Sequence, residues 1–294
     1  MNSFNSVLTS FFDAVLTPLE WVGPATALIV VSGIFGVLAL LVFKQISWQA
    51  GIKAAKDRIK GHMIEIRIYQ DDLVVVASAV GKVVLQNVKY LGLNFGPLLP
   101  LAIPFAFVSA QFVVRYAYAP LPITAPDAKL LAGQGTLLEI DLAPERANEV
   151  RDLKVTLPPG LKAVSPLVRV PSRGQAFQEF VAVAPGRHEI VLEIGGEHET
   201  KLVFAGPEAA PRWMQPRRVS NGNWFKLTDP DHWPVLWPAE PGLPSDSALG
   251  SIAITYPLRP VRYWPDGELG ILLGIVAASM VIGAFALKPL GVQI

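Results

Sequence analysis

The chain has 294 residues, of which 51% are hydrophobic, with 25 basic and 24 acidic residues and a formal net charge of +1. This near-neutral balance argues against a nucleic-acid partner, because phosphate binding needs an excess of clustered Lys and Arg. The absence of Cys excludes disulfides, thiol chemistry and Cys-ligated zinc, so packing alone must stabilise any exported part of the chain.

Residues 1–20 lack the basic start and the small-residue cleavage site of a secretory signal, so we expect a retained membrane anchor to follow them. Their apolar residues recur at helical spacing, which predicts a short amphipathic helix lying in the outer membrane interface. The alternative is a plain hydrophobic lead-in to the first span. The residues of this stripe are Phe4, Val7, Leu8, Phe11, Phe12, Val15 and Leu19.

Three stretches, residues 21–43, 90–114 and 269–287, contain no Asp, Glu, Lys or Arg. A helix needs about 20 apolar residues to cross a hydrocarbon core of about 30 Å. A charge at mid-bilayer costs about 2.5 to 3.5 kcal/mol on insertion scales. The sequence therefore predicts three transmembrane helices, although the last stretch has the alternative of a soluble core helix.

Residues 44–89 are predicted to form a cytoplasmic helical hairpin, because they carry eight basic residues against four acidic ones, whereas residues 1–20 carry two acidic residues and no base. Lys288 after the third span agrees with this orientation. We therefore expect an outside amino terminus, an external domain over residues 115–268 and a cytoplasmic tail over residues 288–294. Five aromatic residues mark the predicted outer ends of the spans: Trp21, Tyr116, Tyr118, Tyr263 and Trp264.

Two apolar stripes in this hairpin have the spacing of a narrow helix–helix seam. Asp71 and Asp72 lie between the stripes and are suited to cap the second helix. Two antiparallel helices are predicted, and the alternative lays both flat on the inner leaflet. The stripes are Ile52, Ala55, Ile59, Met63 and Ile66, then Leu73, Val76, Val80, Val83 and Asn87. The basic surface that would face water and anionic lipid headgroups contains Lys53, Lys56, Arg58 and Lys60.

The second helix of the hairpin is expected to end near Gly92, and the membrane part of the second span to begin near Pro97. Pro104 lies inside this span and should kink it. The chain contains, in order, an outward-starting span, a charged cytoplasmic hairpin, the Pro-rich run at residues 96–105 and a third span. The order of these features resembles the core of the YidC-type membrane insertase superfamily. The resemblance covers about 140 residues and does not include the large external insert.

This resemblance implies a groove between the spans, lined by Ser109 and Gln111, and a hairpin that receives a client chain. The predicted spans contain few clearly polar side chains, and the other two are Ser32 and Ser279. The alternative for Gln111 is a hydrogen bond to a neighbouring helix near the outer interface.

Short apolar segments separated by turn residues follow Pro120, a rhythm typical of a β-sandwich. Gly195 and Gly196 indicate a hairpin. In the strand before them Ile190, Leu192 and Ile194 point to one face, which predicts an antiparallel sheet with one covered side. We expect an immunoglobulin-like topology. The predicted strands are 136–142, 150–157, 161–170, 177–183, 188–194, 200–204 and 251–256.

Residues 205–250 break this rhythm with eight prolines and four tryptophans. A long irregular segment inside a folded domain is usually functional or covers something. Because Trp concentrates binding energy at interfaces, the segment is a candidate docking surface for a protein partner. The alternative is that the indoles cover the edge of the sandwich or rest on the outer leaflet. The residues are Trp213, Trp224, Trp233 and Trp237.

The sequence shows no recognisable reaction centre. Its four His residues lie apart without a zinc-binding pattern, and Asp229-Pro230-Asp231 beside His232 is first of all a turn. We therefore expect no metal, no cofactor and no enzymatic activity, and a small-molecule substrate is not expected. Membrane lipid and other membrane or envelope proteins are the expected partners.

The favoured hypothesis is a non-catalytic scaffold or assembly subunit in the bacterial inner membrane, whose external sandwich docks a membrane complex. A YidC-like insertase or membrane-protein chaperone is the alternative. An enzyme acting on an envelope substrate through residues 205–250 is a third hypothesis. An exported domain without Cys suits a bacterial envelope.

Overall fold

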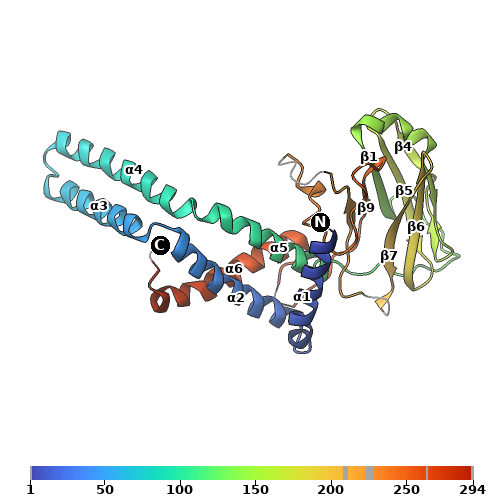
Figure 1. Cartoon of the computed structure of the whole chain (residues 1–294), viewed down its shortest axis with the longest axis horizontal. Coiled ribbons are helices and arrows are strands. Elements are labelled where there is room, and N and C mark those ends of the chain that lie inside the picture. The colour runs from blue at the N-terminus through green and yellow to red at the C-terminus, as the bar shows by residue number, and fades with distance from the viewer. Residues whose placement is uncertain (1, 208–210, 223–227, 263, 293–294) are drawn as a thin grey trace. The chain divides into compact units, whose positions relative to one another are not determined.

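The computed structural model describes residues 2–207, 211–222, 228–262 and 264–292. It is an α+β protein with long apolar helices and antiparallel sheets (Figure 1). The chain divides into two compact units, Met1–Ala27 with Phe107–Gly274 and Leu28–Ala106 with Ile275–Ile294. The first contains the sheets and the second contains the greater part of the apolar helices.

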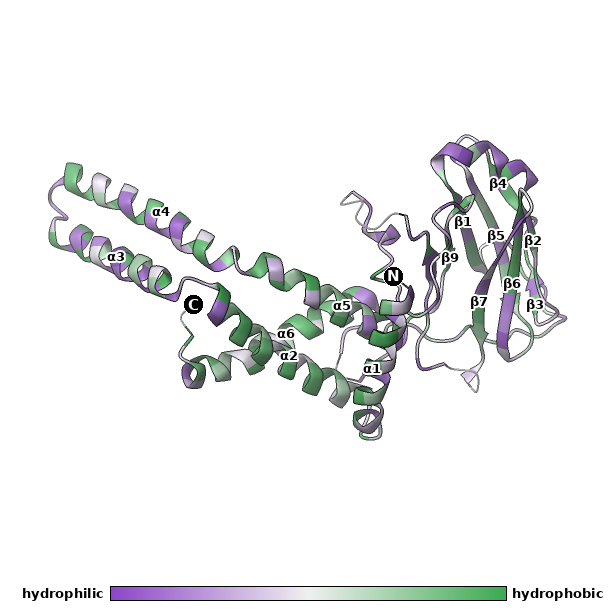
Figure 2. Cartoon of the chain, viewed as in Figure 1, coloured by the Kyte–Doolittle hydropathy of each residue, from purple (hydrophilic) through white to green (hydrophobic). Residues whose placement is uncertain are grey.

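Four helices in the described residues are long and apolar enough to cross a membrane. They are α2 (Pro24–Ile46), α4 (Leu73–Phe95), α5 (Leu98–Tyr116) and α6 (Gly267–Leu290). Helices α2, α5 and α6 correspond to the three predicted spans, and α2 and α6 are hydrophobic along almost their whole length (Figure 2). Helix α4 qualifies because it is rich in Val and Leu, although it contains Lys82 and Lys89.

Helix α3 (Gln49–Ile68) pairs with α4. The predicted cap is confirmed, since the Asp72 carboxylate accepts hydrogen bonds from the backbone N–H groups of Val74 and Val75 at 3.0 and 3.2 Å. The predicted seam is only partly buried: Met63 and Val80 are 59% and 46% exposed. The buried residues of the pair are Gly51, Ile52 and Ala55 in α3 and Ala79 in α4.

The break between α4 and α5 falls at Gly96 and Pro97, three residues later than the predicted end of α4. The backbone N–H of Gly96 still donates to the carbonyl of Gly92 at 3.0 Å, so the helix runs through Gly92. Pro97 cannot donate a backbone hydrogen bond, and this ends the helix. Pro104 lies inside α5 as expected.

Helices α2 and α6 approach closely through small residues. An added Cβ at Gly36 would meet the backbone of Ser279, with the Cα of Ser279 at 2.9 Å, and Gly33 faces the side chain of Ile282 in the same way. Small residues let helix backbones come together in a membrane, where packing rather than hydrophobicity drives association.

Replacing Gly36 with Ala is expected to destabilise the helical unit by about 1 to 3 kcal/mol, because the new methyl group collides with backbone that cannot rotate away. The matched control is Gly81→Ala in α4, where no atom lies within 4 Å of the new Cβ. That change should be neutral or should stabilise by up to about 1 kcal/mol through helix propensity. Thermal unfolding of the purified chain in one detergent compares the two. A Gly36→Ala variant as stable as wild type would refute the close crossing.

The β domain contains two antiparallel sheets. The larger sheet has the order β3-β5-β1-β9-β8, with β4 also paired to β5, and the smaller has the order β2-β6-β7. Buried apolar side chains of both sheets form its core, including Ile140 and Phe180 from one and Ile190 and Leu192 from the other. The strands of the larger sheet are β1 (Thr136–Leu142), β3 (Leu161–Ala163), β4 (Val168–Val170), β5 (Gln175–Ala182), β8 (Arg217–Val219) and β9 (Leu249–Ile254). Those of the smaller are β2 (Lys154–Thr156), β6 (Gly186–Ile194) and β7 (Glu197–Ala205).

The predicted alternation in β6 is confirmed, since Ile190, Leu192 and Ile194 are buried and Glu189 is exposed. Gly195 and Gly196 have φ values of 56° and 83°, which two-residue β-hairpin turns of type I′ require. Two strand predictions need correction. The segment 150–157 is shortened to β2 because a 3₁₀ helix, η1 (Pro144–Asp152), takes its first residues, and the segment 161–170 is divided into β3 and β4.

Candidate functional site

Helix α1 (Asn2–Glu20) packs on the end of α5 through a buried ionic network, here called the Arg115 junction. The Arg115 side chain is 1% exposed, and its Nη2 lies 2.6 Å from Asp13 Oδ1 and donates to the carbonyl of Thr9 at 3.1 Å. Its Nη1 donates to the backbone carbonyl of Gln111 at 3.2 Å and also to the side-chain amide oxygen of Gln111. The Gln111 amide in turn donates to Thr9 Oγ1 at 3.2 Å. One guanidinium therefore ties three residues of two helices together.

The Arg115 junction extends to residues 205–250, here called the Pro- and Trp-rich segment. Arg212 lies 3.8 Å from Glu20 and 4.0 Å from Asp13, and it donates to the Thr17 hydroxyl. At the far end of the segment, the backbone N–H of Gly242 donates to the Asn2 side chain at 3.0 Å. Helix α1 is thus held against both α5 and the irregular segment.

The two faces of α1 differ in their surroundings. Its buried residues recur at helical spacing and include two polar ones, while apolar residues on another face remain exposed: Phe4 by 52%, Val7 by 71% and Phe11 by 59%. The predicted apolar stripe is therefore divided, because one of its members, Phe12, faces the protein. The buried residues are Asn5, Thr9, Phe12 and Leu16.

Ser109 and Gln111, the residues predicted to line a groove, are 3% and 0% exposed. Gln111 belongs to the Arg115 junction, which matches the alternative of a hydrogen bond to a neighbouring helix. Ser109 Oγ has no hydrogen-bond partner among the described residues. Neither lies on the apolar cavity described below.

The predicted Trp surface is not a single exposed patch. Trp237 is 5% exposed, and its indole N–H donates to the carbonyl of Asp231 at 3.2 Å, so it stabilises the segment itself. Trp213 is half-buried and meets the ring of Phe204 edge-on at 6.3 Å. Trp233 is also half-buried, and Trp224 lies outside the described residues. Trp213 and Trp233 are therefore the described members that a partner could reach.

A buried ion pair between Lys201 on β7 and Glu240 anchors the Pro- and Trp-rich segment to the smaller sheet. The two side chains are 0% and 4% exposed. Lys201 Nζ also donates to the carbonyl of Gln215 at 2.7 Å, and Glu240 Oε1 accepts the backbone N–H of Leu202 at 3.0 Å. Burial lowers the pKa of Lys201, and the neighbouring Glu240 carboxylate opposes that shift. Sequence reasoning missed this pair, although Lys201 occupies the inward phase of β7 with Val203 and so gave a signal.

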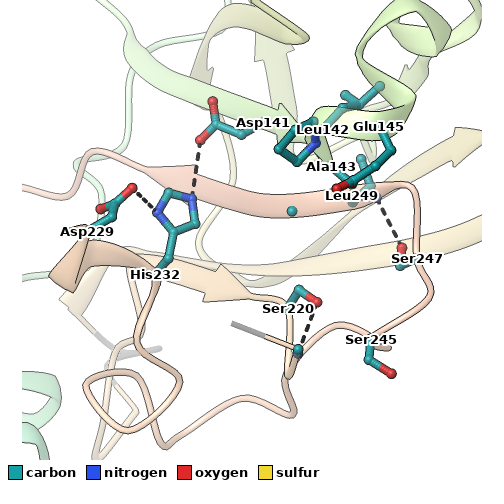
Figure 3. Close-up of a pocket in the computed structure, with 13 residues that line it drawn as sticks. Asp141, Leu142, Ala143, Glu145, Ser220, Asp229, His232, Ser245, Ser247 and Leu249 are labelled. Carbon is teal, nitrogen blue, oxygen red and sulfur yellow. Dashed lines mark hydrogen bonds and ion pairs between the residues drawn. The ribbon is translucent and has the colours of Figure 1, made fainter. Parts of the chain in front are cut away.

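A polar pocket of about 380 Å³ lies beside the end of β1 and the start of η1 (Figure 3). His232 lies at one side of it, in the short 3₁₀ turn η3 (Pro230–His232), with Nδ1 2.7 Å from Asp229 and Nε2 4.0 Å from Asp141. Asp141 accepts hydrogen bonds from the side chains of Gln175 and Ser251 at 2.8 and 2.7 Å. Burial, assisted by repulsion from Asp141, raises the pKa of the nearby Glu139 carboxyl.

The contacts around His232 do not activate the Ser251 hydroxyl as a nucleophile. The Ser251 hydroxyl donates to Asp141 rather than to the imidazole, and both imidazole nitrogens face carboxylates. A hydroxyl activated by a base needs that base within hydrogen-bond reach. Among the described residues, no group of three or more His, Cys, Asp or Glu side chains has the arrangement of a metal site. The geometry therefore favours a structural role, in which Asp229 and Asp141 hold His232 and its turn η3 in place.

On α3, the four basic residues predicted to face water are exposed: Lys53, Lys56, Arg58 and Lys60. Comparison of the chain with protein-family models, with curated proteins and with solved structures found no match.

Proposed function

We propose that the chain is a non-catalytic scaffold or assembly subunit of a bacterial inner membrane, in which an external immunoglobulin-like domain docks a membrane complex. In this proposal α2, α5 and α6 span the bilayer, and α3 and α4 form the cytoplasmic hairpin. The positive-inside distribution of Lys and Arg supports this orientation.

The Arg115 junction is the observation that carries the proposal. It fixes α1, the end of α5 and the start of the Pro- and Trp-rich segment in one compact unit. A domain on a flexible tether would not need a buried guanidinium at its base, because desolvating a charge is costly unless rigid partners surround it. Rigid attachment of α1 and the end of α5 to this segment suits a protein that presents one fixed docking surface.

The exposed apolar face of α1 supports the same proposal. Phe4, Val7 and Phe11 are more than half exposed on a helix whose other face is held by protein. An amphipathic helix of this kind lies in the headgroup region with its apolar residues in the acyl boundary. Helix α1 would then orient the β domain relative to the membrane surface.

The test is affinity purification of the tagged full chain in mild detergent. One stoichiometric complex is expected, and Trp233→Ala or Trp213→Ala should release the partner, because both indoles are half-buried at the surface of the segment. The control is Val168→Ala, which changes an exposed apolar residue on β4 and should leave the complex intact. Unchanged co-purification of both Trp variants would count against the docking surface, and the lack of any stoichiometric partner would count against the scaffold.

A second candidate function is the insertase-like or membrane-chaperone activity that the resemblance implies. The paired hairpin with its exposed basic residues favours it, since such a surface can receive a client chain. Crosslinks from a photoreactive group at Arg58 to nascent membrane proteins would support this candidate. Crosslinks to lipid alone would argue against it.

A further inference from the structure

The helical unit contains an apolar cavity of about 630 Å³ between α2, α4, α5 and α6. Phe43, Tyr90, Leu101 and Leu287 lie at one end of it, and Gly36 and Ser279, which approach each other closely, also line it. Side chains beside the cavity are open at the surface, since Phe95 and Met280, which line it, are 61% and 68% exposed. The cavity is thus open at the surface of the helical unit.

An apolar cluster closes the end of the cavity that is marked by Phe43. Its buried members are Phe43, Ile52 and Val292, and Tyr90 and Leu287 pack against them. This cluster, here called the floor of the cavity, lies where the uncharged stretches of α2 and α6 end.

Three lysines are next in sequence to residues at this floor. Lys44, Lys89 and Lys288 each follow or precede a residue that lines the cavity there, and all three are exposed. Lys44 Nζ donates to the carbonyl of Leu290 at 2.6 Å, which places its charge over the seam between α2 and α6.

Nothing acidic in the neighbouring sequence balances these lysines. Residues 41–56, 83–95 and 284–292 contain no Asp or Glu. The rest of the cavity is bounded by helix segments without any charged residue. The site thus has an uncharged apolar body and one cationic end.

From this complementarity we infer that the cavity binds an anionic phospholipid, with an acyl chain in the apolar body and the phosphate near Lys44, Lys89 and Lys288. A zwitterionic lipid fits the body equally well but gains less at the cationic end, because Lys side chains attract the net negative charge of an anionic headgroup. The inference requires only that these helices lie in a bilayer. It is independent of what the β domain docks.

Native mass spectrometry of the full chain, purified from mixed micelles of phosphatidylglycerol and phosphatidylcholine with identical acyl chains, tests the site. We expect one phosphatidylglycerol to be retained in preference to phosphatidylcholine. The triple variant Lys44→Gln, Lys89→Gln and Lys288→Gln should reduce that preference at least about tenfold. The matched control removes the same charge from the part of α3 beyond this floor, through Arg58→Gln, Lys60→Gln and Arg67→Gln, and should keep the preference.

A second variant separates the cavity from the charge. Ala284→Trp places an indole at an exposed cavity-lining position with all lysines intact, so it should prevent lipid retention without disturbing the floor. Equal retention of both lipids by the wild type, equal loss in the two triple variants, or full retention in Ala284→Trp would each overturn the inference. A stoichiometric protein helix crosslinked at position 284 in place of lipid would also overturn it. Failure here leaves the co-purification test unaffected.

Discussion

Replacing Lys201 with Met is expected to destabilise the β domain by about 3 to 5 kcal/mol, the cost of breaking a buried ion pair from one side. The Glu240 side chain, which is 4% exposed, would lose its cationic partner. The carbonyl of Gln215 would also lose a donor. The Pro- and Trp-rich segment would then be held less firmly to β7, because this pair is one of its attachments to that strand, beside the ion pair of Arg218 with Glu199.

The double variant Lys201→Met with Glu240→Gln provides the control. A neutral Gln can still accept the backbone N–H of Leu202, so no uncompensated charge remains and most of the lost stability should return. Urea unfolding of the full chain, followed by Trp fluorescence, measures both variants against wild type. A single variant within about 1 kcal/mol of wild type would show that the pair does not hold the segment, since surface changes already span about half that value.

Local sequence patterns were sufficient to predict those elements whose structure depends on residues close together in the sequence. The uncharged stretches 21–43 and 269–287 match α2 and α6, the stretch 90–114 is divided between the end of α4 and α5, and Asp72 caps α4 as its position predicted. The hairpin of β6 and β7 follows from Gly195 and Gly196, whose backbone conformation other residues rarely adopt. In each case the deciding interaction lies within a few residues.

Elements that depend on distant partners were not predictable in the same way. Strand β8 contains Arg217 and Arg218 and shows no apolar alternation, and it exists because its backbone pairs with β9. Lys201 and Glu240 are 39 residues apart, so the inward position of Lys201 in its strand signals a buried charge but does not identify its partner. The Trp residues illustrate the same limit, since Trp237 is buried by its own segment while Trp233 is not.

The Arg115 junction shows why a charge count misses a site. By sequence, Arg115 is simply the first charged residue after an uncharged span, and Asp13 is an acidic residue before another. A positive-inside argument uses the sign of each residue but not its partner. The structure joins the two across 102 positions, and this contact depends on α1 folding back onto α5.

Replacing Arg115 with Met is expected to cost about 3 kcal/mol, the low end for a broken buried pair, because Asp13 is 29% exposed and keeps some contact with water. The loss has a second cause, since the carbonyl of Thr9 and the amide of Gln111 also lose their donor. Hydrogen exchange of the full chain should show faster exchange in α1, whereas the paired strands β6 and β7 should exchange as in wild type.

The Arg115→Lys variant distinguishes charge from geometry. Lysine keeps the positive charge but lacks the planar fork that reaches Asp13, Thr9 and Gln111 at once, so its effect should fall between wild type and Arg115→Met. Arg58→Met on the exposed surface of α3 is the matched control and should change stability by no more than about 0.5 kcal/mol. If α1 exchanges no faster in Arg115→Met than in Arg58→Met, the Arg115 guanidinium does not hold α1 in place. The contacts of Arg212 with α1 would then be the attachment between this helix and the Pro- and Trp-rich segment.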